Sequence, residues 1–149
     1  MPNDKVPGFT LLEMLLSIAL IAMLAGMFLP LYGAVYVKND LDLATSAIIQ
    51  DLRRAQTLSQ AVDSDSMWGV HVQTGSVILF QGPNYAGRAV AFDEGFAFSN
   101  TINLAGLTDV VFSKMIGEVN PAGGGTLTLT ASNNDVRAIT LTTKGTLSY

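Results

Sequence analysis

Glu13 is the only charged residue between Phe9 and Val37, in a run of 29 residues that is otherwise mostly apolar. A carboxylate one turn into a membrane-length helix costs roughly 2.5 to 3.5 kcal/mol on insertion scales, so it needs a partner or a role. The chemistry that it offers there is an ion pair. As a helix the run would measure about 44 Å, against about 30 Å for the hydrocarbon core of a bilayer. We therefore predict a transmembrane or filament-core helix over residues 9–37.

The run Gly8-Phe9-Thr10-Leu11-Leu12-Glu13, with Pro30 further along, resembles the processing site of type IV pilins and type II secretion pseudopilins. This resemblance implies that residues 1–8 are a leader, removed by cleavage after Gly8, and that Phe9 is then N-methylated. A side chain at Gly8 would crowd the peptidase, although a glycine ahead of a helix is also typical of a cap. Because the cut site precedes the apolar run, cleavage would leave that run on the mature protein, unlike a secretory signal.

Three interpretations of Glu13 stay open. It pairs with the α-ammonium of Phe9 on a neighbouring subunit, which the resemblance favours. It pairs with the same group in its own chain, four residues away, or it extends unpaired to the lipid headgroups. In the first case, cleavage at Gly8 creates the cation that assembly uses.

Gly26 and Pro30 are two weak points in the predicted helix. Pro30 has no N–H to donate to the carbonyl of Gly26, and glycine is itself a poor helix former, so both defects fall on one hydrogen bond. The pair predicts either a static kink or a segment that unwinds when subunits assemble. Pilins that this chain resembles carry proline at the same mature position.

The composition argues against several classes of function. The chain has 149 residues, 49% of them hydrophobic and 13% charged, and no cysteine. From Asp63 onward seven acidic and four basic residues give a net charge of −3, which disfavours a nucleic-acid partner. His71 fits a partly exposed sheet residue, and Asp63-Ser64-Asp65 lacks the later ligands of a calcium loop. We therefore expect no catalytic residues, no cofactor and no metal.

Residues 38–62 predict an amphipathic helix that continues the apolar one. Apolar residues recur every three or four positions and form one stripe. Asp51 and Arg54 offer an i,i+3 ion pair. The stripe comprises Leu41, Ala44, Ile48, Leu52, Ala55, Leu58 and Val62.

Residues 63–149 predict a small antiparallel β domain, because the apolar period falls to two. Glycine and asparagine mark turns at 74–75, 133–135 and 144–145, and residues 121–125 predict a flexible loop. Trp68, Phe96 and Phe98 are assigned to the core. The predicted strands span 68–73, 76–81, 88–92, 110–112, 126–131, 136–142 and a short segment ending at Tyr149. The fold class is therefore α+β, with a long N-terminal helix packed on the sheet.

Residues 112–149 are similar to the C-terminal region of H-type minor pseudopilins and FimT-like proteins. This resemblance implies a structural subunit of a type II secretion pseudopilus or type IV pilus, anchored in the bacterial inner membrane with its C-terminal domain outside the cytoplasm. Its implied partners are the prepilin peptidase/methyltransferase, other pilin or pseudopilin subunits, the lipid bilayer and the inner-membrane assembly platform. The alternatives are a DNA-binding minor pilin, for which the C-terminal end lacks a basic cluster, a major pilin, and a membrane-tethered enzyme that never polymerises.

Overall fold

The computed structural model describes residues 8–120 and 123–149, and for residues 27–34 the backbone alone. Two units, Met1–Tyr36 and Val37–Tyr149, are each described by themselves. The helix α1 (Leu11–Gln60) begins in the first and ends in the second. The predicted leader up to residue 7, the side chain of Pro30 and the start of the predicted loop at 121–122 lie outside the described part.

The first unit contains the N-terminal part of α1. Its apolar side chains are exposed within this single chain, Leu11 by 80% and Leu20 by 55%. Within the residues that the structure describes, no helix combines the length and the apolar character that crossing a membrane requires.

In the second unit, which we call the head, the C-terminal half of α1 buries the predicted stripe. Leu41, Ala44, Ile48, Leu52 and Ala55 are buried, and Leu58 packs against them. The helix ends at Gln60 and not at residue 62, because the chain turns into a left-handed conformation at the last position of the stripe. A short 3-10 turn follows at Asp63–Asp65.

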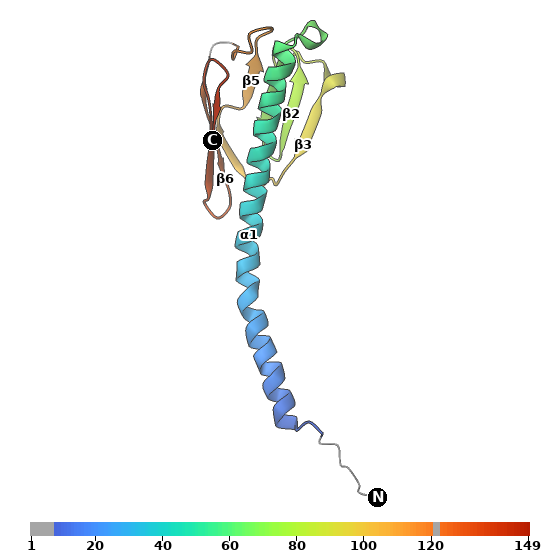
Figure 1. Ribbon diagram of the computed structural model, residues 1–149, viewed down its shortest axis with the longest axis vertical. Coiled ribbons are helices and arrows are strands. Elements are labelled where there is room, and N and C mark those ends of the chain that lie inside the picture. The colour runs from blue at the N-terminus through green and yellow to red at the C-terminus, as the bar shows by residue number, and fades with distance from the viewer. Residues whose placement is uncertain (1–7, 121–122) are drawn as a thin grey trace, which may run out of the picture. The chain divides into compact units, whose positions relative to one another are not determined.

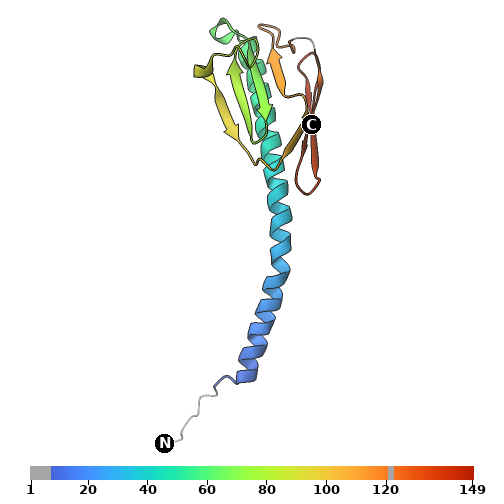
Figure 2. The same ribbon diagram turned by 180° about the vertical axis from the view of Figure 1, so that it is seen from behind.

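The strands of the head form two four-stranded antiparallel sheets. Sheet A has the order β3-β2-β1-β5 and sheet B the order β4-β6-β7-β8. In Figure 1 strands β2 and β3 emerge on one side of the helix and β6 on the other, and Figure 2 shows the sheets from behind. The strands are β1 Trp68–Gln73, β2 Ser76–Gln81, β3 Glu94–Ala97, β4 Asn103–Gly106, β5 Asp109–Phe112, β6 Gly125–Thr130, β7 Val136–Leu141 and β8 Leu147–Ser148. The predicted α+β class is confirmed, with two small sheets where one was expected.

The two faces of sheet A are covered by different groups. Directly paired residues of antiparallel strands point to the same face, so the register shows which side chains lie on each. Val70 pairs with Leu79 and Val110, and these side chains join the core beneath α1. Gly69 pairs with Phe80 and lies on the opposite face. A Cβ atom at Gly69 would lie 2.6 Å from the Phe80 ring, so the ring fills the space that the glycine leaves.

A buried serine attaches the end of the helix to the first strand. The backbone N–H of Trp68 donates to Ser59 Oγ over 2.9 Å, and both residues are buried. The predicted hairpin turn after β1 is confirmed, with Gly75 at a φ of 83°, where a Cβ would be strained. The turns before β7 and β8 are confirmed as well, with positive φ at Asn134 and Gly145.

The predicted strand at 88–92 is wrong. After β2 the chain turns back, with the Ala89 N–H bonded to the Gln81 carbonyl, and then forms a 3-10 turn at Val90–Phe92. The apolar residues of this segment are exposed and pair with no strand. The third strand is instead β3. Gly95 and Ala97 have low strand propensity, so the pairing with β2 makes this segment a strand, not the local sequence.

The predicted pair between Asp51 and Arg54 is also wrong. The Arg54 guanidinium instead forms a bidentate ion pair with the Glu94 carboxylate on β3, and this pair competes with the one predicted to Asp51. A second ion pair, between Arg137 on β7 and Asp42, joins the helix to sheet B at 2.9 Å. The helix is therefore tied to both sheets by charged contacts at its margins.

Candidate assembly site at the start of the helix

The start of α1 has the geometry of a helix cap. Thr10 precedes the helix, and its Oγ1 accepts the backbone N–H of Glu13 over 3.2 Å. Thr10 and Glu13 have the spacing of a capping box, in which the threonine satisfies a helix donor and the acid lies in the first turn. The Thr-x-x-Glu pattern is the sequence signal for this cap, a role of Thr10 that the predictions above did not include.

The predicted processing residues lie in exposed backbone before the helix. Gly8, Phe9 and Thr10 are exposed, and α1 begins only at Leu11. A Cβ atom at Gly8 would have nothing within 4 Å in this chain. The peptide bond between Gly8 and Phe9 is thus open to another protein.

Glu13 is exposed in the first turn of α1, where the helix dipole favours an acid. Ser17 donates to its backbone carbonyl over 2.7 Å, a contact that leaves the carboxylate untouched. Within the described residues, no ion pair involves Glu13. In this uncleaved chain the nitrogen of Phe9 is an uncharged amide, so the structure tests none of the three interpretations of Glu13.

The predicted weak point of the helix is only partly described. Gly26 is exposed, and an added Cβ there would meet nothing within 4 Å. Pro30 lies in the stretch of α1 whose side chains are outside the described residues. Kink and unwinding therefore remain alternatives.

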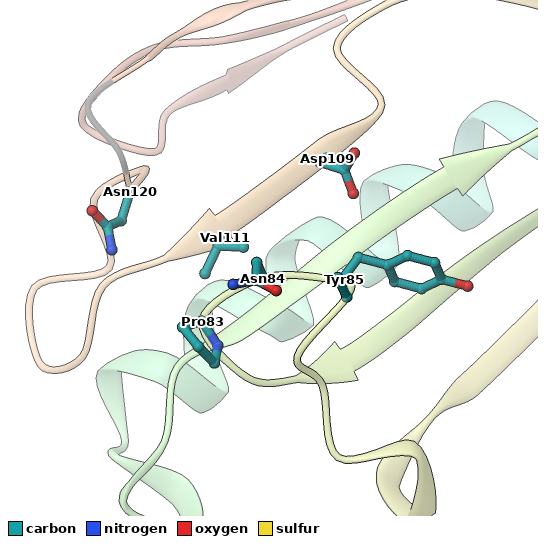
Figure 3. Close-up of a pocket in the computed structure, with 7 residues that line it drawn as sticks. Pro83, Asn84, Tyr85, Asp109, Val111 and Asn120 are labelled. Atoms are coloured by element: carbon teal, nitrogen blue, oxygen red, sulfur yellow. The ribbon is translucent and has the colours of Figure 1, made fainter.

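The head has an open cleft of about 470 Å³ beside the loop that follows β2. Figure 3 shows Pro83, Asn84 and Tyr85 of this loop near Asp109 and Val111 of β5. Asn84 of the loop is bonded within the chain, since its Oδ1 accepts the Gly87 N–H over 2.7 Å.

The aromatic ring of the same loop is engaged too. Tyr85 stacks on His71 with 3.8 Å between ring centroids, and the Arg88 guanidinium lies 3.9 Å from its centroid. A hydrogen bond to Asp93 over 2.7 Å raises the pKa of Arg88 above its usual value. These contacts hold the loop against sheet A, and the Tyr85 ring packs between His71 and Arg88 of the same chain.

His71 lies on β1, mostly buried, and its Nδ1 is 2.7 Å from Asp109 Oδ1. This is the only histidine of the sequence. The described part of the chain contains no group of three or more His, Asp or Glu residues that could hold a metal ion. The His71–Asp109 pair has a structural role: His71 stacks on Tyr85 and so holds the loop after β2 against sheet A.

Comparison with known proteins identifies the N-terminal segment. Residues 4–29 match the prokaryotic N-terminal methylation motif, which includes the predicted cleavage and methylation positions Gly8 and Phe9 and also Glu13. No curated protein matches the chain. The matched range overlaps the start of α1, and the head is a small antiparallel domain.

The fold is similar to that of a solved structure. The minor pseudopilin EpsH from the type 2 secretion system of Vibrio cholerae is similar with a TM-score of 0.54 at 14% sequence identity. The match covers 73% of this chain and 94% of EpsH. The fold is therefore that of a pseudopilin, and the motif and the fold together support the role of a pilin-like structural subunit.

Proposed function

We propose that the chain is a minor pseudopilin of a type II secretion pseudopilus or a minor pilin of a type IV pilus. One observation carries this proposal: a prepilin-type methylation motif precedes a head with the fold of a minor pseudopilin. Such a subunit works by taking its place in a polymer. It catalyses no reaction, and it supports protein secretion or pilus biogenesis.

Processing is the first step of the proposal. A prepilin peptidase cuts between Gly8 and Phe9, and the new N-terminus is methylated. The exposure of both residues before the first turn of α1 supports this step, because proteases require accessible, non-helical backbone. The helix from Leu11 onward is untouched by the cut.

Anchoring is the second step. The segment from Phe9 to Val37 holds the subunit in the inner membrane as a single pass, with the head on the periplasmic side. The segment then leaves the bilayer for the polymer, with the help of the assembly platform. Its exposed apolar side chains support this step, since burying each large one in lipid or among neighbouring helices is worth about 1.5 to 3 kcal/mol.

Assembly is the third step, and it depends on the charge of Glu13. Cleavage converts the amide nitrogen of Phe9 into a cation, and Glu13 of a neighbouring subunit pairs with it. The attraction between the two charges is strongest where water is excluded, so it fixes the register between helices. Gly26 and Pro30 weaken the same helix and let it adapt as subunits pack.

The test replaces the carboxylate while keeping the processing site. Glu13→Ala and Glu13→Gln remove the charge, and Glu118→Ala removes an exposed acid of the head as the matched control. We expect all three variants to be cleaved and methylated, as measured by intact mass. Only the two Glu13 variants lose polymer assembly or secretion. Assembly at the parental level in both Glu13 variants would contradict the proposal.

A further inference from the structure

β3 is an edge strand with an unused side. It pairs with β2 in sheet A, and among the described residues no other strand pairs with it. All four of its residues, Glu94 to Ala97, are exposed. An open edge presents backbone donors and acceptors that can template another strand.

The register shows which backbone groups face outward. The Phe98 N–H donates to the Gly75 carbonyl over 2.9 Å, so this directly opposed pair is hydrogen-bonded. Hydrogen-bonded pairs alternate along an antiparallel ladder, so Phe96 also bonds toward β2. Gly95 and Ala97 lie between these positions, and their N–H and C=O groups point away from β2.

The outward-bonding residues are small. A Cβ at Gly95 would find its nearest neighbour, the Val77 carbonyl oxygen, 3.9 Å away, so the space around it is open. Ala97 adds a single methyl group. Neither proline nor lysine, the residues that commonly protect an edge, occurs in β3.

A groove runs beside this edge on the helix side. It has a volume of about 140 Å³, enough for a side chain, and lies between α1 and Phe96 of β3. Leu43 is 55% exposed and Phe96 39%, so the groove has an apolar lining that this chain leaves partly uncovered. The lining residues are Leu43, Ser46, Ala47, Gln50, Asp51 and Phe96.

The groove carries an acid that is poorly compensated. Burial raises the pKa of Asp51, the nearby Glu94 raises it further, and Arg54 opposes both effects. Because the Arg54 guanidinium is already bonded to the Glu94 carboxylate, these three residues leave one negative charge. A cation from outside would balance it. The edge of a second copy would instead bring another Asp51 and Glu94, and like charges would meet.

We propose that the outer edge of β3 binds an extended segment of a partner protein as a fifth strand of sheet A. The segment alternates an apolar and a basic side chain on the face toward α1, so that one fills the groove and the other reaches Asp51. Gly95 and Ala97 supply the backbone hydrogen bonds, as in other cases of strand addition. This partner site goes beyond the proposed function, because it lies in the head and does not use Glu13.

The probe is a displayed library of random eight-residue peptides, selected against the full chain in detergent micelles. Selection is repeated with Ala97→Pro, which removes an outward N–H without removing a bond to β2. We expect enriched peptides that carry a basic and an apolar residue two positions apart, so that both lie on one face of the strand. These peptides should lose about fivefold in affinity on Ala97→Pro, since the one lost bond is worth about 1 kcal/mol. Asp51→Asn weakens binding of the basic peptides, and Glu118→Ala leaves it unchanged.

A change in the peptide removes any dependence on how well the proline variant folds. N-methylation of alternate peptide amides blocks one edge of the guest strand, and we expect one of the two alternating sets to abolish binding while the other preserves it. The proposal is overturned if no peptide distinguishes the parent from Ala97→Pro. Enrichment of acidic peptides, or equal binding by both N-methylated sets, would overturn it as well. None of these outcomes depends on cleavage or assembly, so they leave the proposed function to its own test.

Discussion

The two units treat their apolar side chains in opposite ways. In the head, the stripe of α1 is covered by the sheets of the same chain, with Ile48 and Leu52 buried. In the first unit, Leu11 and Leu20 are exposed although the helix is at least as apolar. The head therefore derives its stability from within the chain. The exposed apolar side chains of the first unit are not covered by the chain itself, which suits the burial in lipid or among other helices that we propose.

The largest effect that we predict concerns processing of the first unit. Gly8→Val places a branched side chain beside the bond to be cut, and we expect cleavage to fail almost completely. The uncut chain keeps its leader and remains outside the polymer. Intact mass of the membrane-bound protein measures this directly. Gly26→Ala is the control, since it changes another exposed glycine of the same unit and should leave cleavage intact.

The second prediction compares burial in the two units. Ile48→Ala removes a fully buried side chain, so we expect the head to lose about 2 to 5 kcal/mol of unfolding free energy. Leu20→Ala removes a similar side chain from the exposed segment and should change that value by less than about 0.5 kcal/mol. Denaturant titration in detergent, followed by fluorescence of the single tryptophan Trp68, measures both. Equal losses would break the comparison.

The third prediction concerns two glycines of sheet A. At Gly69 an added Cβ would lie 2.6 Å from the Phe80 ring and 2.7 Å from the Val110 carbonyl oxygen. We expect Gly69→Ala to destabilise the head by about 1 to 3 kcal/mol, because the backbone itself must move. At Gly95 on β3 an added Cβ would make only an ordinary van der Waals contact, 3.9 Å from the Val77 carbonyl oxygen, so Gly95→Ala should stay within about 0.5 kcal/mol of the parent. The same titration would refute the packing argument if the two variants behaved alike.

The smallest predicted effect is the pH dependence caused by Asp51. Burial raises its pKa above the usual 3.8, so the folded state holds this proton more tightly than the unfolded state. The contribution of Asp51 to stability therefore falls as pH rises from 3.8 through the raised pKa, and it is constant above. An asparagine at this position would not titrate, so the Asp51→Asn variant does not lose this contribution to stability as pH rises. We expect the variant to gain stability relative to the parent across that interval, and a gap that shrank with rising pH would contradict the assignment.

The two units also differ in how far the sequence predicts them. The methylation motif could be predicted because its residues are adjacent along the chain, from Gly8 to Glu13, and no folding is needed to bring them together. The stripe of α1 was predictable for a similar reason, since helical spacing is a local property. The cap at Thr10 was equally local and was simply overlooked.

The head depends on contacts between distant residues, and there the sequence was less informative. Val90 and Phe92 have the alternating spacing of a strand, yet the chain turns back after β2, where the Ala89 N–H donates to the Gln81 carbonyl. Glycine and alanine in β3 do not favour a strand, and pairing with β2 imposes one. Arg54 pairs with Glu94, 40 residues away, and not with its helix neighbour Asp51. The open edge of β3 follows from register, which composition does not encode.

Mass analysis of the N-terminus, on protein taken from assembled polymer, tests the central claim most directly. The account predicts a mature chain that begins at N-methylated Phe9, with Glu13 as its fifth residue. Assembled protein that retained Met1 to Gly8 would contradict it, because no terminal cation would then exist for Glu13 to bind.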